Sequence, residues 1–106
     1  TTPKGIQRAE ELQAEINEQA SVLTLYQYKA CLFCVKVRRS LKLLSLLIET
    51  RDAKRCDIAK NELLEGGGKL KVPCLKVVGK QGDVQWMYES SEIINFLEDR
   101  FQAKAA

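Results

Sequence analysis

The feature that most constrains this chain is a Cys-x-x-Cys pair that joins a short apolar run to a helical pattern. Cys31 and Cys34 follow residues 22–26, which are β-branched and aromatic in the manner of a strand. After the pair, apolar residues recur at helical spacing at Val37, Leu41, Leu44 and Ile48. Two thiols at this spacing close a small disulfide ring or share a metal ion, and the motif alone leaves both possibilities open.

The strand-then-helix setting gives the two cysteines different expected roles. Cys31 falls at the tip of the strand, on or just before the first helical turn, where unpaired N–H groups and the positive end of the helix dipole favour a thiolate. Lys29 adds a positive charge in the same sense. Cys34 lies one turn further in and is expected to be more buried. An exposed nucleophile beside a shielded resolving thiol is what disulfide exchange requires, because the second thiol breaks the mixed disulfide made by the first.

Composition narrows the class of protein. A chain of 106 residues with a net charge of +3 is expected to form one domain with a modest core. Its four cysteines accompany an ordinary apolar content, which favours a reducing compartment over a secreted disulfide scaffold. Histidine is absent, which removes the commonest zinc ligand and any Cys-His or Ser-His-Asp site. No stretch approaches the roughly 18 apolar residues of a membrane span.

The first half of the chain predicts helices around two strands. A narrow apolar stripe predicts an amphipathic helix that starts after Pro3, so residues 1–20 are interpreted as a helical extension and residues 21–106 as the main domain. A short second strand is expected at residues 48–52. Asp57 is then expected to cap a helix over residues 58–64, which the three glycines that follow would end.

The second half predicts a hairpin and a last helix. A strand is expected over residues 71–78, followed by a turn at residues 79–83 and a strand in which Val84, Trp86 and Tyr88 alternate. Ser90 is the expected cap of the last helix, whose buried side would carry Ile93, Leu97 and Phe101. This order of elements predicts an α/β fold with a small mixed sheet covered by helices.

The remaining cysteines and the basic residues are expected to have no chemical role. Cys74 is interpreted as a small buried residue on a strand, and Cys56 as a surface thiol without a role. The basic residues at 36–42 and 51–55 are interleaved with apolar and acidic ones, so they are interpreted as a solvated face and not as a nucleic-acid surface.

Three separated motifs together resemble the glutaredoxins over about residues 22–101. They are Cys31-Leu32-Phe33-Cys34 after the first strand, Val72-Pro73 before the third, and Glu89-Ser90 at the start of the last helix. In its last third the chain looks even more like the amino-terminal, thioredoxin-like domain of glutathione transferases, and bacterial glutaredoxin-like proteins of that type are particularly similar. The resemblance implies a thioredoxin-like, glutaredoxin-type four-stranded mixed sheet flanked by helices, with an N-terminal helical extension.

The resemblance also implies roles for individual residues. Cys31 would be the nucleophile that takes glutathione as a mixed disulfide, and Cys34 the resolving thiol. The family usually has proline after the first cysteine, where this chain has Leu32, so the acidity and redox potential of Cys31 are expected to differ from those of proline-containing relatives.

A glutathione-binding set follows from the same resemblance. The backbone of Val72, beside a cis peptide at Pro73, would bind the cysteinyl part, and Glu89 and Ser90 would bind the γ-glutamyl end at a helix start. Lys29 belongs to the expected set for the glycine carboxylate, although many glutaredoxins carry their lysine one position earlier. No metal site is expected within the chain.

The function that the resemblance implies is a glutathione-dependent thiol-disulfide oxidoreductase that reduces mixed or protein disulfides. Two alternatives remain: a [2Fe–2S] protein in which Cys31 of two subunits and two glutathiones hold the cluster, which Leu32 favours, and a non-catalytic glutathione-binding adaptor. Glutathione is the expected cofactor and disulfide-containing proteins the expected partners, without nucleic acid. The protein is expected to be cytoplasmic and monomeric unless it binds a cluster. A hydrophobic segment in some similar proteins suggests a membrane tether upstream of Thr1, on the cytoplasmic side.

Overall fold

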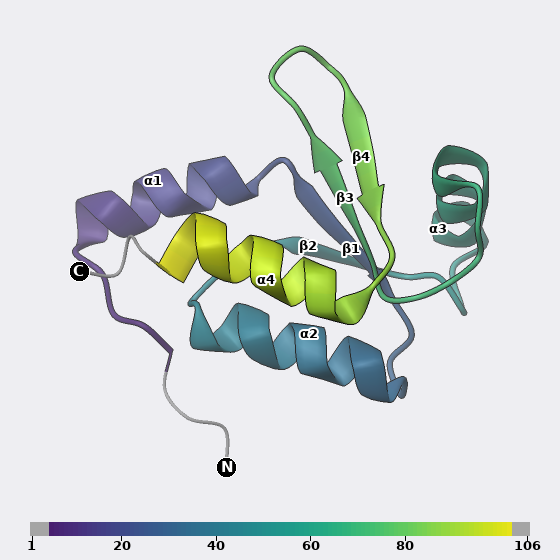
Figure 1. The fold of residues 1–106 in the computed structure, drawn as a ribbon, viewed down its shortest axis with the longest axis horizontal. Helices are drawn as coiled ribbons and strands as arrows, with labels where there is room; N and C mark the ends of the chain where they lie inside the picture. The colour runs from purple at the N-terminus through teal and green to yellow at the C-terminus, as the bar shows by residue number, and fades with distance from the viewer. Residues whose placement is uncertain (1–4, 103–106) are drawn as a thin grey trace.

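A four-stranded mixed sheet with helices on both faces forms the structure, a computed structural model that describes residues 5–102. The elements are α1 (Glu10–Ala20), β1 (Leu23–Gln27), α2 (Leu32–Leu43), β2 (Glu49–Asp52), α3 (Asp57–Glu62), the π-helical turn η1 (Leu63–Gly67), β3 (Cys74–Val78), β4 (Val84–Met87) and α4 (Ser90–Phe101) (Figure 1). The strand order is β2-β1-β3-β4, with β1 parallel to β2 and antiparallel to β3, and β3 antiparallel to β4. The predicted fold is confirmed.

The alternation of side chains along the strands divides the core between the two faces of the sheet. Leu23, Leu25 and Leu75 enter the larger core cluster, which also takes in buried residues of α1, α2 and α4. Tyr26 and Cys74 point to the opposite face, where they join a smaller cluster with Ala59 and Leu63 of α3 and η1. Figure 1 shows α2 and α4 side by side and α3 set apart from them. Strands β1 and β3 therefore contribute side chains to both core clusters.

The first helix begins later than its apolar stripe predicts. It starts at Glu10 and not after Pro3, and Pro3 itself lies outside the described residues. The segment before it takes its hydrogen bonds from other elements: the N–H of Ile6 donates to the carbonyl of Leu43 at 2.9 Å, and the guanidinium of Arg8 donates to the carbonyl of Phe101 at 3.1 Å. Tertiary hydrogen bonds therefore replace the helical ones that the sequence pattern predicts.

Both predicted helix caps are wrong by one residue. Asp57 and Ser90 are the first helical residues of α3 and α4, and the preceding Cys56 and Glu89 hold the extended backbone of a cap. Neither cap makes a side-chain hydrogen bond to its helix. The predicted glycine stop is confirmed, because Gly68 ends η1 in the left-handed region at φ 86°.

Within residues 5–102, no helix is long and apolar enough to cross a bilayer.

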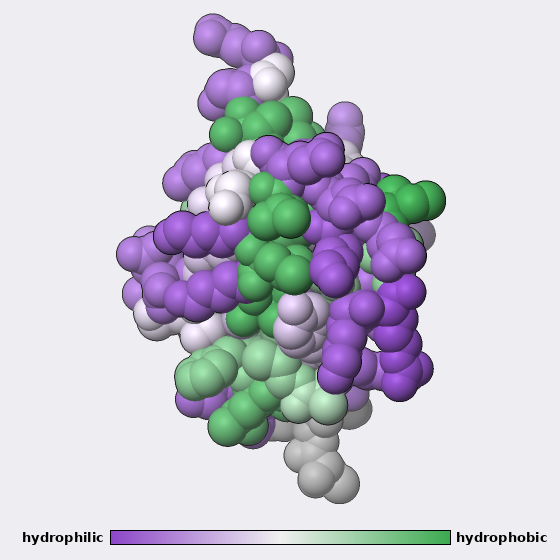
Figure 2. Space-filling model, turned by 90° about the vertical axis from the view of Figure 1, so that its right-hand side faces the viewer, coloured by the Kyte–Doolittle hydropathy of each residue, from purple (hydrophilic) through white to green (hydrophobic). Residues whose placement is uncertain are grey.

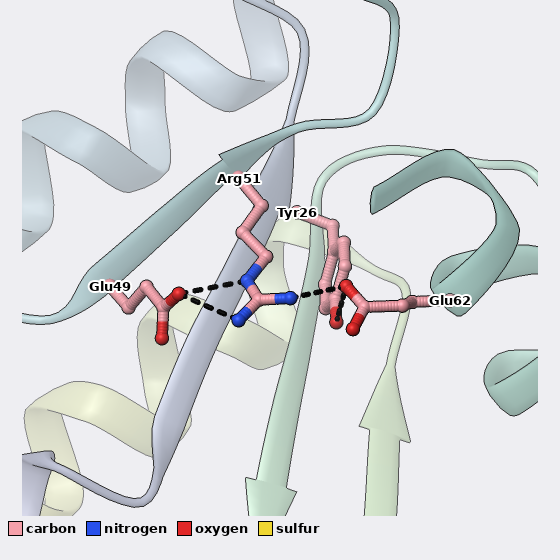
Figure 3. A network of polar contacts seen from close by, with 4 residues as sticks. All are labelled: Tyr26, Glu49, Arg51 and Glu62. Carbon is pink, nitrogen blue, oxygen red and sulfur yellow. Dashed lines mark hydrogen bonds and ion pairs between the residues drawn. The ribbon is translucent and has the colours of Figure 1, made fainter. Parts of the chain in front are cut away.

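A polar network holds α3 against the sheet (Figure 3). The hydroxyl of the buried Tyr26 on β1 donates to Glu62 of α3 at 3.3 Å, and Arg51 of β2 pairs with Glu62 and, at 2.8 Å, with Glu49. Burial, followed by the charge of Glu62, raises the pKa of Tyr26 to about 12, so its hydroxyl remains a donor. Arg51, one of the basic residues at 51–55 that were interpreted as a solvated face, is 34% exposed and also makes these contacts to α3.

Gly67 is expected to be required for the close packing of η1 against Tyr88. A Cβ at Gly67 would overlap the Tyr88 hydroxyl, which donates to the carbonyl of Lys69 at 3.0 Å. Replacing Gly67→Ala should therefore reduce the free energy of unfolding by about 1–3 kcal/mol, as overpacking does elsewhere. Urea denaturation measures this change. The substitution Asn61→Ala at an exposed position of α3 is the control. An unchanged midpoint for Gly67→Ala would show that Tyr88 can move away from the added methyl group.

Candidate functional site

The candidate site lies at the edge of the sheet where four strand ends meet. Because β3 is antiparallel to both β1 and β4, its beginning lies beside their ends. The loop after β1 carries Cys31, the loop before β3 carries Pro73, and Glu89 follows β4. The end of β2 reaches the same edge because β2 runs parallel to β1. The three separated sequence motifs are thereby brought together by strand direction alone.

The two thiols of the motif have different surroundings. Cys31 is the N-cap of α2, partly exposed, with an extended backbone and its carbonyl accepting the N–H of Val35 at 2.9 Å. Cys34 is fully buried, and its Sγ accepts the N–H of Tyr28 at 3.5 Å. Both thiols are free. The predicted contrast between an accessible and a shielded cysteine is present.

The pKa values of the two thiols move in opposite directions. Burial by itself would raise the pKa of Cys31, but hydrogen bonds from the N–H and thiol of Cys34 and the N–H of Phe33, with the charge of Arg38, hold it below its ordinary value. Burial raises the pKa of Cys34 to about 11, and the hydrogen bond with Cys31 adds to this effect. Of the two thiols, Cys31 is therefore the one that loses its proton first as the pH rises.

Arg38 is a site residue that sequence reasoning missed. Its guanidinium donates to the carbonyl of Lys29 at 2.9 Å and to the side chain of Gln27, so it ties α2 to the loop that leads to Cys31. It is half-buried, which corrects its interpretation as part of a solvated face. The only sequence signal for this role is the position of Arg38 four residues after Cys34, which places the two side chains on the same side of α2.

The charge and contacts of Arg38 are expected to set the reactivity of Cys31. In Arg38→Gln the pKa of Cys31 should rise, because a positive charge that stabilises the thiolate is removed. Alkylation by iodoacetamide across a pH series should then reach half of its maximal rate at a higher pH, with a several-fold lower rate near neutrality. The exposed neighbour gives the control, Arg39→Gln, which should match the wild type. A wild-type profile for Arg38→Gln would contradict the assigned role.

A small pocket of about 210 Å³ joins the second and third motifs. It is lined by Phe33, Lys71, Val72, Pro73, Glu89 and Ser90 among others. The Val72–Pro73 peptide is cis, as the resemblance implies. The ammonium of Lys71 lies 3.2 Å from the carboxylate of Glu89, and both side chains are more than half exposed. The pocket thus presents one cation, one carboxylate and the N-terminus of α4 together.

Tyr88 also lines this pocket, and the sequence identified it only as a strand residue. Its hydroxyl bonds to the carbonyl of Lys69, just before Lys71, and its backbone precedes Glu89. The pKa of Tyr88 is raised by burial and by the nearby thiol of Cys74. Tyr88 therefore links the loop before β3 to the start of α4 through a single side chain.

Other candidate residues lie apart from that pocket. Lys29 lines a different pocket, together with Cys31, and is not among the residues that line the pocket of Val72 and Ser90. Cys74 is buried on β3, as predicted, and burial raises its pKa to about 12. Cys56 is exposed, as predicted. Across the described part of the chain, no group of three or more His, Cys, Asp or Glu side chains is arranged to hold a metal ion.

The chain belongs to the family of glutathione S-transferase N-terminal domains, whose model matches residues 25–105. Mouse prostaglandin E synthase 2 is 36% identical over 107 residues, which cover 92% of this chain and 26% of that protein. The chain thus spans about a quarter of the length of this curated relative.

One solved structure supports the same family, and two others share its fold. Maleylacetoacetate isomerase from Anaeromyxobacter dehalogenans with bound GSH is 27% identical, with a TM-score of 0.57 over 79% of this chain and 39% of that one. A glutathione transferase Omega 3C from Trametes versicolor gives a TM-score of 0.61 at 23% identity over 94% and 44%. A buckwheat glutaredoxin–glutathione complex gives 0.59 at 16% identity over 92% and 94%. The two with lower identity show the thioredoxin-like fold alone. The proteins similar to this chain in sequence or fold thus include an isomerase, transferases and a synthase.

Proposed function

We propose that this chain is a glutathione-dependent thiol-disulfide oxidoreductase in which Cys31 is the nucleophile and Cys34 the resolving thiol. The observation that carries the proposal is the pair of opposed thiol environments, with an accessible low-pKa Cys31 at the start of α2 and a buried high-pKa Cys34 one turn on. A pocket with one cation and one carboxylate, which complement the charges of an amino acid head group, lies at the same edge of the sheet. Family relatives with bound glutathione support the choice of thiol.

The reaction begins with attack of the Cys31 thiolate on a disulfide between glutathione and a partner thiol. An S–S bond forms between Cys31 and the glutathione sulfur, the original S–S bond breaks, and the partner leaves as a thiolate that takes a proton from water. A second glutathione thiolate then attacks the sulfur of the bound glutathione. Oxidised glutathione leaves and the Cys31 thiolate is restored. The net reaction therefore consumes one free glutathione thiol, which joins the glutathione half of the mixed disulfide, while the partner half is released as a thiol.

Protein disulfides use the second cysteine. When Cys31 is bound to a partner sulfur its negative charge and its hydrogen bond with Cys34 are lost, and both of these raise the pKa of Cys34 in the free protein. Cys34 is then more easily deprotonated and attacks Cys31, which releases the reduced partner and forms the Cys31–Cys34 disulfide. Burial keeps Cys34 protonated until that stage, so the two steps occur in order.

The charges in the small pocket match the γ-glutamyl head of glutathione. Its ammonium pairs with Glu89, and its carboxylate meets Lys71 and the free N–H groups at the start of α4. Exposed ion pairs contribute only about 0–1 kcal/mol, so the Lys71–Glu89 pair opens to the ligand at little cost. Val72 and Pro73 line the same pocket, where they meet the cysteinyl part.

Two serine variants test the roles of the thiols. Cys31→Ser should abolish glutathione-coupled reduction of a small glutathione mixed disulfide, whereas Cys34→Ser should retain most of it, since that substrate needs only one thiol. Reduction of a protein disulfide should fail in both. The assay is coupled turnover with the absorption spectrum recorded on each sample. Full activity of Cys31→Ser would exclude the proposal. An inactive wild type would favour a [2Fe–2S] protein if it is coloured and an adaptor if it is colourless.

Glutathione recognition is tested by Glu89→Gln. Loss of a charge-assisted contact that is open to water should raise the KM for glutathione about five- to tenfold and change kcat little. Glu92→Gln removes another carboxylate from the first turn of α4 without touching the pocket, and should leave the KM unchanged. Equal KM values for the two variants would show that glutathione binds elsewhere.

A further inference from the structure

A pocket of about 420 Å³ lies at the end of the sheet opposite to Cys31. It forms where β1 begins and β3 ends, with Val22 and Val78 in its lining, whereas Cys31 follows the end of β1. It shares no lining residue with the pocket proposed for glutathione. Figure 2 shows the hydrophilic turn between β3 and β4 at the top of the molecule, with apolar surface directly below it. The proposed oxidoreductase reaction makes no use of this end of the molecule.

Two carboxylates on α1 give this pocket an acidic side. Glu15 and Glu18 line it, and because they are three residues apart on a helix their like charges are neighbours that repel. Glu18 also lies in the last turn of α1, where the negative end of the helix dipole disfavours a carboxylate and no basic residue offsets it. Among residues 5–102, neither carboxylate forms an ion pair. An ammonium group that enters from solvent would relieve both effects.

Two cations from other elements give the same pocket a basic side. Lys80 lies in the turn between β3 and β4, and Arg100 lies in the last turn of α4. Both are exposed, and neither is in an ion pair with another residue of the described part of the chain. The guanidinium of Arg100 lies 5.6 Å from the centre of the Phe96 ring. Stacking on a ring restricts the side chain but leaves its charge available, so Arg100 is held ready for a carboxylate.

Apolar side chains complete the lining. Val22 is 37% exposed although it directly precedes β1, and Val77 is almost buried at the end of β3. The N–H of Val78 donates to the carbonyl of Val22 at 3.1 Å, so the backbone under this apolar part is held in place. The pocket therefore combines two carboxylates, two cations and an apolar patch, within the volume range of small-molecule sites. Because the opposite charges are equal in number, it favours a ligand without net charge over a simple anion or cation.

We propose that this pocket binds short peptides that have an apolar side chain and two free termini. The ammonium terminus pairs with Glu15 and Glu18, the carboxylate terminus pairs with Lys80 and Arg100, and the apolar side chain covers Val22. A peptide fits better than a single amino acid, because the two sets of charges belong to different elements of the fold. The charged groups of a single amino acid are attached to one carbon atom, whereas those of a peptide are separated by its backbone.

The first test titrates the tripeptide alanyl-leucyl-alanine into isotope-labelled protein and follows the backbone amide signals by NMR. The signals of Val78 and Gly79, which line the pocket, should shift and saturate, whereas that of Ser90 in the glutathione pocket should not. Acetylation of the amino terminus, amidation of the carboxyl terminus and serine in place of leucine should each weaken binding about five- to tenfold at low salt. No saturable shift at Val78 and Gly79 up to about 10 mM peptide overturns the proposal.

Two double variants assign the termini of the peptide. Glu15→Gln/Glu18→Gln should bind the free tripeptide and its acetylated form equally, because the ammonium group has lost its partners. Lys80→Gln/Arg100→Gln should bind the free tripeptide and its amide equally, for the same reason at the other end. A variant that still distinguishes its pair of ligands as the wild type does would contradict the assigned contacts.

The matched control removes the same charge from the other end of α1. Glu10 and Glu11 lie in the first turn of that helix, are exposed and do not line the pocket. Glu10→Gln/Glu11→Gln should therefore bind the tripeptide as the wild type does. An equal loss of affinity in this variant and in Glu15→Gln/Glu18→Gln would mean that net charge alone is responsible, which overturns the proposal.

A last control separates this pocket from the one proposed for glutathione. Glu89→Gln should leave the affinity for the tripeptide unchanged, and an excess of glutathione should not displace it. Weaker binding in Glu89→Gln, or displacement by glutathione, would place the tripeptide in the glutathione pocket and overturn the proposal. Because every measurement is of binding alone, the result does not depend on whether the oxidoreductase function holds.

Discussion

Antiparallel pairing of β1 with β3 is the constraint on which the rest of the structure depends. It sets Tyr26 opposite Cys74 and Leu25 opposite Leu75, so the end of β1 always lies beside the start of β3. The register is fixed because both leucines must face the larger core, and a shift by one residue would turn them to the other side. This pairing brings Cys31 and Pro73 to the same end of the sheet, although they are distant in the chain.

One helix terminus produces two thiols with different chemistry. Cys31 and Cys34 have the same side chain and are one turn apart, but the first faces free N–H groups and the second is enclosed by the core. The contrast in pKa therefore comes from backbone geometry and burial. The charge of Arg38 lowers the pKa of both thiols, and its hydrogen bonds to Gln27 and Lys29 hold the loop before Cys31 in place. Local electrostatics thus decides which sulfur attacks and which waits.

The wall of the site that α3, η1 and Tyr88 form is held by polar contacts more than by a large hydrophobic core. The cluster beneath α3 has few buried members, and the contacts of Tyr26, Glu62 and Arg51 hold that helix to β1 and β2. Tyr88 continues this wall to the loop that contains Val72. Exposed ion pairs contribute little each, so the wall has less stabilisation than the face of α2 and α4. The proposed glutathione pocket therefore lies between a well-packed half and a lightly packed half of the molecule.

The sequence by itself determined the order of elements, the Cys-x-x-Cys motif at a strand-to-helix junction, and the buried stripe of α4, because periodicity and turn residues act locally. It missed the true start of α1 at Glu10, the roles of Arg38 and Tyr88, and the separation of Lys29 from the pocket of Val72 and Ser90. Each of these depends on contacts between residues far apart in the chain. Only the tertiary structure decided which charges surround Cys31, because strand pairing sets which loops share an edge of the sheet, and no local pattern records that choice.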